Sequence, residues 1–193
     1  MRYSKEHKEQ TRQRILEAAG RVFRRQGYQG GGVDAVMREA GLTHGGFYAH
    51  FPNKEALFAE TIRTTMEGLP FWQRQEDDDL HWLDQIFEGY LSDQHLQSMA
   101  EGCPAPPLAS EVARAGDAAQ EAFEEGARGI QALIEGRLGH LPEAERRPAA
   151  LAILATLVGT LGLARAVHDD RFASEILAAS REHLRQSMLP QNT

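Results

Sequence analysis

The sequence predicts an all-α protein with a short N-terminal three-helix head and a longer helical body. Apolar residues recur along the chain at the three- and four-residue spacing of amphipathic helices. Short alternating β-branched runs bounded by turns, which would predict strands, are missing. Charge is also divided unevenly, because residues 1–55 contain ten Lys/Arg and six Asp/Glu, a net of +4, whereas the remainder carries a net of −11.

We expect two domains in these 193 residues, a head at residues 1–55 and a body at residues 56–193. A basic head on an acidic body indicates that one end of the protein meets a polyanion. The single cysteine excludes an intramolecular disulfide and a four-cysteine zinc site, and the first ten residues lack an apolar signal-peptide core, so we expect a cytoplasmic protein. The apolar run at residues 149–164 is too short for a membrane span, and we expect no membrane partner, metal or cofactor.

The head is predicted to begin with an amphipathic helix whose apolar residues recur at i, i+4, i+7 and i+8, with arginines on its other faces. These apolar residues are Ile15, Ala19, Val22 and Phe23. Gly27 is a natural end for this helix, and the glycines at residues 30–32 predict a flexible joint.

A short helix is predicted at residues 33–40, ended by Gly41 in the left-handed conformation that helices use after their last turn. Thr43 is a suitable N-cap for the next short helix, which ends before Pro52. A longer helix then begins at residues 52–53. Its apolar side consists of Leu57, Phe58, Ile62 and Met66.

The body is predicted to be a series of helices separated by a break at residues 69–79 and by two proline-containing interruptions. The expected helices are residues 80–91, 108–115, 117–138, an apolar helix that starts between Pro142 and Pro148 and runs to about residue 167, and residues 172–188. The apolar helix needs cover on every side. Together with the last helix it is the candidate dimer interface, as a four-helix bundle made from two copies of the chain. The alternative is the central core helix of a monomer.

The two short helices joined by Gly41-Leu42-Thr43 indicate a helix-turn-helix, a motif whose second helix enters the DNA major groove by its N-terminal end. That helix starts with Thr43, His44 and two glycines, Gly45 and Gly46. Each glycine inside a helix costs about 1 kcal/mol relative to alanine, so the pair is better explained if a large partner approaches the backbone. His44 is then the long side chain at the tip.

The aromatic spacing in this helix separates a core face from an outer face. Phe47 and Phe51 are expected to face the core, and Tyr48 and His50 to point outward toward phosphate oxygens. Lys54 lies at the start of the next helix, where a cation opposes the helix dipole, and an anion bound there would explain it. The alternative is a helix-turn-helix with a purely structural role.

Residues 9–62 closely resemble the DNA-binding domain of the TetR family of transcriptional regulators. The matching positions, in order, are Ile15-Leu16-Glu17-Ala18-Ala19, Phe23, Gly27-Tyr28, Ala40-Gly41-Leu42-Thr43, Phe47-Tyr48, His50-Phe51 and Lys54-Glu55-Ala56-Leu57. The resemblance implies a helical homodimer with a DNA-reading head and a variable body that senses a small molecule. It also implies that Thr43, Tyr48, His50 and Lys54 hold phosphates, whereas His44, Gly45 and Gly46 approach bases.

One departure from the family concerns the residues before the second helix. The family usually has Ser or Thr there, and this chain has Gly31 and Gly32. Glycine caps a helix nearly as well, but it removes one side-chain phosphate contact. Either the affinity for DNA is somewhat lower, or an N-terminal arm containing Arg2, Lys5 and Lys8 compensates.

Cys103 is the strongest candidate in the body for a side chain that senses an effector. It lies in a Gly-Cys-Pro interruption between helices, where a thiol could react with an electrophile or oxidant. Glu101 next to it disfavours a thiolate, and a free cysteine is more often a small buried hydrophobe.

The sequence leaves three hypotheses for the function. The first is a ligand-responsive DNA-binding regulator, a repressor that binds a palindromic double-stranded operator as a dimer and is released by a small-molecule effector, with electrophiles or oxidants as one class. The second is an enzyme, for which no nucleophile–base pair, phosphate loop or metal cluster is visible in the sequence. The third is a helical interaction protein that has lost DNA binding, which the Gly31-Gly32 pair leaves open. We expect the first.

Overall fold

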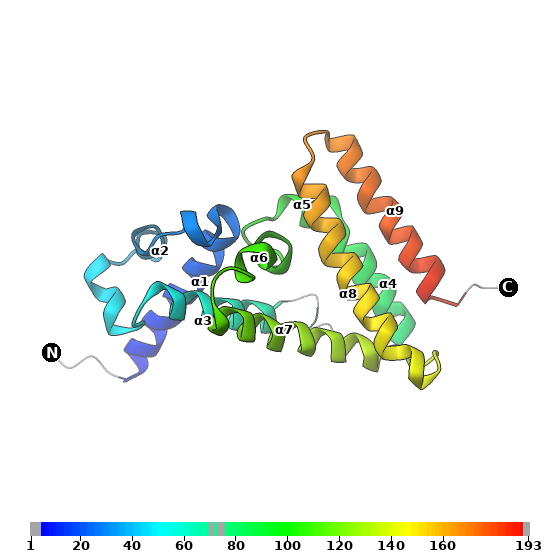
Figure 1. The fold of residues 1–193 in the computed structure, drawn as a ribbon, viewed down its shortest axis with the longest axis horizontal. Helices are drawn as coiled ribbons and strands as arrows, with labels where there is room; N and C mark the ends of the chain where they lie inside the picture. The colour runs from blue at the N-terminus through cyan, green and yellow to red at the C-terminus, as the bar shows by residue number, and fades with distance from the viewer. Residues whose placement is uncertain (1–4, 70–71, 73–75, 191–193) are drawn as a thin grey trace. The chain divides into compact units, whose positions relative to one another are not determined.

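The structure is a computed structural model that describes residues 5–69, 72 and 76–190, and the regular structure in these residues is helical (Figure 1). The chain packs into two compact units. Unit 1 contains Met1–Glu67 and Met99–Gly126, and unit 2 contains Gly68–Ser98 and Ala127–Thr193. The expected functional boundary at residue 55 stays a prediction, because these units are defined by packing rather than by function.

Unit 1 contains the three predicted helices of the head together with a later segment of the chain. Its elements are α1 (Lys5–Gly30), α2 (Val33–Glu39), the 3-10 helix η1 (His44–Ala49), α3 (Lys54–Glu67), α6 (Ala105–Val112) and the first half of α7 (Asp117–Gly136). The helix-turn-helix is confirmed, with a tight 3-10 turn as its second helix.

Two glycines shape the ends of α1 and α2. Gly27 has φ 72° and ψ 174°, so α1 is broken at the residue where the sequence predicted its end, although helical turns continue to Gly30. Gly41 has φ 66°, which confirms the predicted left-handed termination of α2. Arg14 donates to the carbonyl oxygen of Ala40 at 2.8 Å and so stabilises the C-terminal end of α2.

The core of unit 1 is built on aromatic side chains. Phe47 and Phe51 are 0% and 1% exposed, which confirms that they face the core. Phe23 from α1 and Phe58 from α3 are fully buried and meet edge to face, with their ring centroids 5.1 Å apart. Four buried aromatic side chains, from α1, η1, α3 and the segment between η1 and α3, therefore hold the head together.

Unit 2 contains a short helix that the sequence analysis missed. Its elements are α4 (Asp79–Tyr90), α5 (Asp93–Gln97), the second half of α7, α8 (Glu143–Ala166) and α9 (Asp170–Met188). The missed helix is α5, which Ser92 caps by accepting a hydrogen bond from the backbone N–H of His95. Part of the expected break at residues 69–79, namely residues 70–71 and 73–75, lies outside the described residues.

Two helix starts in the second half of the chain differ from those expected. The helix predicted at residues 108–115 is α6, three residues earlier, because Pro106 and Pro107 fit the first turn of a helix, where a backbone N–H has no partner to lose. Likewise α9 begins at Asp170, since Asp169 accepts hydrogen bonds from the backbone N–H groups of Arg171 and Phe172.

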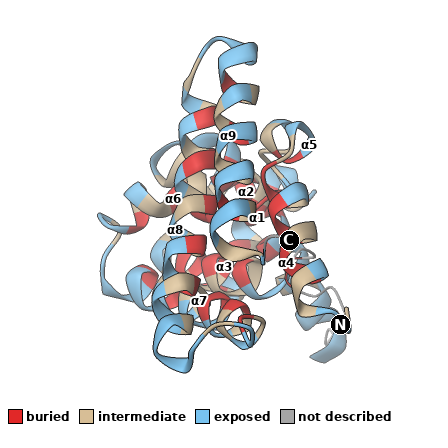
Figure 2. Ribbon diagram, turned by 90° about the vertical axis from the view of Figure 1, so that its right-hand side faces the viewer, coloured by how far each residue is buried: buried red, intermediate tan, exposed pale blue. Residues whose placement is uncertain are grey.

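Helices α8 and α9 lie side by side and antiparallel (Figure 1). In Figure 2, buried and exposed residues alternate along α9, as expected of an amphipathic helix. Arg185 on α9 donates hydrogen bonds to two carboxylates of α4, from Nε to Oδ1 of Asp84 at 2.5 Å and from Nη2 to Oε2 of Glu88 at 2.8 Å. Within the described residues α8 alone has the length and apolarity that a membrane span needs. This helix packs on α9 within unit 2.

One buried histidine makes the stability of unit 2 sensitive to acid. The His95 side chain is 3% exposed and contacts the carbonyl oxygen of Tyr90 through Nδ1 at 2.8 Å. Burial, aided by Arg165 and opposed by the Tyr90 hydrogen bond, lowers the pKa of His95 to about 4. Because the unfolded chain takes up this proton near pH 6.5, the contribution of neutral His95 is complete above that pH and is lost as the pH falls toward 4.

We predict that His95→Asn flattens the pH dependence of unfolding between about pH 6.5 and 4, because asparagine keeps a donor near the Nδ1 position but cannot titrate. The free energy of unfolding of the wild type should fall by roughly 3 kcal/mol more than that of the variant over this range. Urea titrations at a series of pH values measure the difference. Parallel pH profiles would show that His95 is not the acid-sensitive group.

Candidate nucleic-acid interface

The tip of η1 presents open backbone. Thr43 occupies the N-cap position with extended backbone angles, and its hydroxyl makes no cap hydrogen bond within the described residues. A side chain added at Gly45 would find no described atom within 4 Å, and one at Gly46 would meet only the end of Met37, at 3.7 Å. The backbone of this turn is therefore accessible to a large partner, as the glycine pair predicted.

His44 is half-exposed at the first position of η1 and is already paired. Its Nδ1 lies 2.5 Å from Oδ1 of Asp34, which belongs to the first turn of α2. The rings of His44 and Tyr48 also meet in a T-shaped arrangement, with their centroids 6.1 Å apart. The contact with Asp34 joins the two helices of the motif at their outer surface, and nothing in the sequence spacing indicated it.

Tyr48 and His50 differ in how far they point outward. The Tyr48 side chain is 64% exposed, as expected for a phosphate-binding hydroxyl. His50 is half-buried, and its Nδ1 has no hydrogen-bond partner among the described residues. Burial lowers the pKa of His50, and the positive charges of Lys8 and Arg12 lower it further, with Glu9 opposing them. Near neutral pH this ring is therefore mostly the neutral form, which donates one hydrogen bond.

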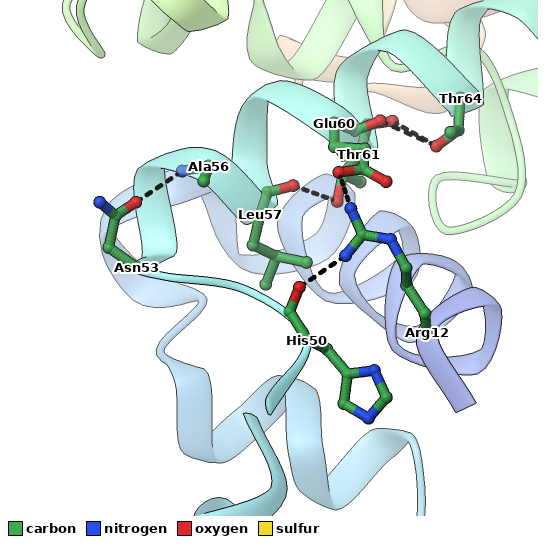
Figure 3. A network of polar contacts seen from close by, with 8 residues as sticks. All are labelled: Arg12, His50, Asn53, Ala56, Leu57, Glu60, Thr61 and Thr64. Atoms are coloured by element: carbon green, nitrogen blue, oxygen red, sulfur yellow. Dashed lines mark hydrogen bonds and ion pairs between the residues drawn. The ribbon is translucent and has the colours of Figure 1, made fainter. Parts of the chain in front are cut away.

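Arg12 fixes the segment that links η1 to α3 (Figure 3). Its guanidinium donates to the carbonyl oxygen of His50 at 2.7 Å and pairs with the carboxylate of Glu60. It also lies over the Phe51 ring, 4.2 Å from the centroid. Helical spacing predicts only that the arginines of this helix lie on its polar faces, because spacing does not tell whether a polar face meets solvent or another segment.

Lys54 is the first residue of α3 and lies over the ring of Tyr28, 4.4 Å from its centroid. Burial lowers the pKa of Lys54, and the nearby carboxylate of Glu111 opposes this. Glu111, from α6, also accepts a hydrogen bond from the backbone N–H of Tyr28. Lys54 thus lies at a point where α1, α3 and α6 meet.

The structure brings most of the predicted site residues onto one short segment. Thr43, His44, Gly45, Gly46 and Tyr48 belong to η1 or its cap, and His50 and Lys54 follow within six residues. Their roles in holding phosphates or approaching bases stay predictions. Of the N-terminal arm, Lys5 and Lys8 are exposed in the first turns of α1, and Arg2 lies outside the described residues.

The two glycines before α2 have different surroundings. A Cβ at Gly31 would lie 2.7 Å from the buried Phe23 ring and 2.9 Å from the carbonyl oxygen of Gly27, so this position requires glycine. Gly32 is the N-cap of α2 with φ −69°, and no described atom lies within 4 Å of its would-be Cβ. The departure from the family pattern therefore has a steric reason at Gly31 and none at Gly32.

Cys103 precedes α6 and is 1% exposed. It belongs to unit 1, together with the helix-turn-helix, rather than to unit 2. This burial is typical of a structural cysteine, because reactive thiols are partly exposed.

Comparison with known proteins agrees with this geometry. Residues 15–61 match the family described as "Bacterial regulatory proteins, tetR family". Residues 15–61 therefore form a DNA-binding domain of the TetR family type. The curated proteins to which the chain is similar are HTH-type transcriptional regulators, which favours the regulator hypothesis over the enzyme hypothesis.

Similar proteins include two curated regulators. The uncharacterized HTH-type transcriptional regulator YfiR of Bacillus subtilis is 34% identical over 93 residues, 45% of each chain. The HTH-type transcriptional regulator UidR of Escherichia coli is 29% identical over 109 residues, 52% of this chain and 56% of UidR. The chain thus spans about half the length of the curated relatives it matches.

Structural similarity covers more of the chain than sequence similarity does. The crystal structure of the reduced form of Escherichia coli NemR superimposes with a TM-score of 0.80 and covers 95% of this chain and 100% of NemR, at 19% identity. This likeness shows that the two chains share the helical fold beyond the head as well as within it. At this identity it supports the fold alone.

We predict that Gly32→Ser stabilises the protein by a few tenths of a kcal/mol, because serine satisfies a backbone N–H at the start of α2. The same hydroxyl should tighten DNA binding by restoring the phosphate contact that the family usually makes. Gly31→Ser is the matched control and should lower the melting temperature, since its Cβ clashes with Phe23 and Gly27. Equal changes in the melting temperatures of the two variants would contradict the steric difference between Gly31 and Gly32.

Proposed function

We propose that this protein is a repressor that binds a palindromic operator as a homodimer and is released by a small-molecule effector. The observation that carries the proposal is the tip of η1, where an accessible Gly45-Gly46 backbone lies between His44 and the 64% exposed Tyr48. This arrangement allows close approach to base edges, with flanking groups available for phosphates. The net charge of +4 on residues 1–55 favours the polyanion electrostatically.

Exposed apolar side chains on α8 and α9 support dimer formation. Leu151 and Leu163 on α8 are 48% and 56% exposed, and Phe172 on α9 is 52% exposed. Covering these side chains with the same helices of a second copy gives a four-helix bundle. A two-fold dimer places two heads on DNA, and the two half-sites of a palindrome match that symmetry.

The effector response is proposed to reach the head through α6. Glu111 on this helix accepts from the backbone N–H of Tyr28 and lies close to Lys54, so α6 contacts both the break in α1 and the start of α3. An effector that favours a state with α6 displaced would change the position of α3 and thereby of η1. A coupling free energy of about 1–3 kcal/mol is enough for a useful response.

Cys103 plays a smaller part in the proposed effector response. Since its thiol is 1% exposed, a reaction with an oxidant or electrophile requires the segment before α6 to open first. A response through Cys103 would therefore be slow compared with reversible binding of a ligand. The protein would act in the cytoplasm, where the operator is found.

The test of the proposal is a gel-shift titration on DNA flanking the protein's own gene, with nonspecific competitor and at two salt concentrations. If that DNA gives no shift, selection from fragmented genomic DNA follows. We expect a discrete, competitor-resistant complex that weakens as salt increases. If the selection also enriches no sequence, the protein is a helical interaction protein that has kept the fold and lost DNA binding.

We predict that Lys54→Ala weakens binding to all operator sequences alike and lowers the slope of log K against log salt by about one per head. The reason is the loss of one phosphate contact per subunit. Tyr48→Phe should weaken binding without changing the salt slope, because it removes a neutral hydroxyl. Binding of Lys54→Ala as tight as that of the wild type at every salt concentration would contradict the docking geometry.

We predict that Leu163→Glu produces a monomer, because a carboxylate would be buried in the proposed helical bundle. Ala118→Glu is the matched control: it adds the same charge at an exposed position in the first turn of α7, where an acidic residue suits the helix dipole. Sedimentation velocity should show a dimer for the wild type and the control. A dimer of Leu163→Glu would place the interface elsewhere.

A further inference from the structure

The contact between Asp34 and His44 has a chemical consequence for base recognition. Asp34 is the second residue of α2, and His44 is the first residue of η1, so the hydrogen bond crosses from one helix of the motif to the other. Both side chains are exposed, at 73% and 51%. Neither is buried in the head core, and the pair faces outward at the tip of the motif.

A carboxylate next to one nitrogen of an imidazole decides where the ring proton lies. An ionised carboxylate only accepts hydrogen bonds, so Nδ1 of His44 must carry the proton and donate it to Oδ1 of Asp34. In a neutral ring the other nitrogen, Nε2, is then left with a lone pair and can only accept. Without Asp34 both neutral tautomers would be available, and Nε2 could also donate.

Donors and acceptors in the major groove are distributed by base. The amino groups of cytosine (N4) and adenine (N6) donate, whereas guanine N7 and O6 and thymine O4 accept. An accepting Nε2 therefore selects cytosine or adenine at the base it touches and disfavours guanine and thymine. Gly45 and Gly46, which follow His44, carry no side chain that would compete for this contact.

We propose that Asp34 is a specificity-determining positioning residue: by holding the proton of His44 on Nδ1, it makes Nε2 an acceptor that reads the amino group of cytosine or adenine. This inference rests on the proposed function, in which His44 approaches bases. Asp34 also favours specific over nonspecific binding in a second way. Its negative charge on a DNA-facing surface disfavours nonspecific binding to phosphates.

The test compares base preferences of the full-length protein by selection from randomised operator DNA at a pH of about 8, at which an imidazole is mostly neutral. His44→Ala first identifies the operator position that His44 reads, because preference is lost there alone. Asp34→Asn should reduce the preference for cytosine or adenine at that position by about two- to tenfold, the range expected for one hydrogen bond. Preferences at other positions should stay unchanged, and Asp34→Asn should have no further effect on base preference in the His44→Ala background.

Glu55→Gln is the matched control for charge. Glu55 is an exposed acidic residue and the second residue of α3, as Asp34 is the second residue of α2, so both changes remove one negative charge from the same helix position. Both should raise nonspecific affinity, and only Asp34→Asn should change the base preference. A change of equal size in Glu55→Gln would overturn the proposal, because it would trace the effect to charge alone.

An NMR measurement tests the pair without DNA. The nitrogen chemical shifts of the His44 ring at a pH of about 8 should show the proton on Nδ1 in the wild type and a mixture of tautomers in Asp34→Asn. A wild-type ring protonated mainly on Nε2 would overturn the inference, even if the protein binds DNA. If selection with the wild type enriches no sequence, the proposed function fails and the inference fails with it.

Discussion

The arrangement of the head depends on the burial of Phe47 and Phe51. The segment that carries both is a six-residue 3-10 helix followed by a turn, and 3-10 hydrogen bonds are too weak and too few to hold so short a helix alone. Each buried phenylalanine contributes roughly 1.5–3 kcal/mol through the hydrophobic effect. Because their spacing of four residues places both rings in the core, the residues between and before them, including His44 and Tyr48, are forced to the outside.

Arginine side chains from α1 also hold the backbone on either side of η1. Arg12 holds the carbonyl oxygen of His50 directly after η1, and Arg14 holds the carbonyl oxygen of Ala40 before it. Both belong to the first half of α1, so this one helix holds the chain just before and just after η1. Glu111 adds a third contact at the break in α1, and through it the later helix α6 becomes part of the same compact unit.

Much of this could be predicted from the sequence because the signals are local. Apolar spacing located the helices, Gly27 and Gly41 marked the ends of α1 and α2, and the order of matching positions indicated the TetR-type DNA-binding domain. The contacts between Asp34 and His44 and between Glu111 and Tyr28 could not be predicted. Asp34 and His44 are 10 positions apart in the sequence, and Tyr28 and Glu111 are 83 positions apart. Only the fold brings the residues of each pair together. The start of α6 lies three residues before the predicted one, because prolines break helices in their interior but are accepted in the first turn.

The central claim is that two heads of a dimer read two half-sites of one operator. Hydroxyl-radical footprinting of the protein on DNA recovered by selection tests it directly. The account predicts two equivalent protected regions whose centres are about 34–36 Å apart along the helix axis, or a multiple of that spacing. A single protected region, or uniform protection without two-fold symmetry, would contradict it.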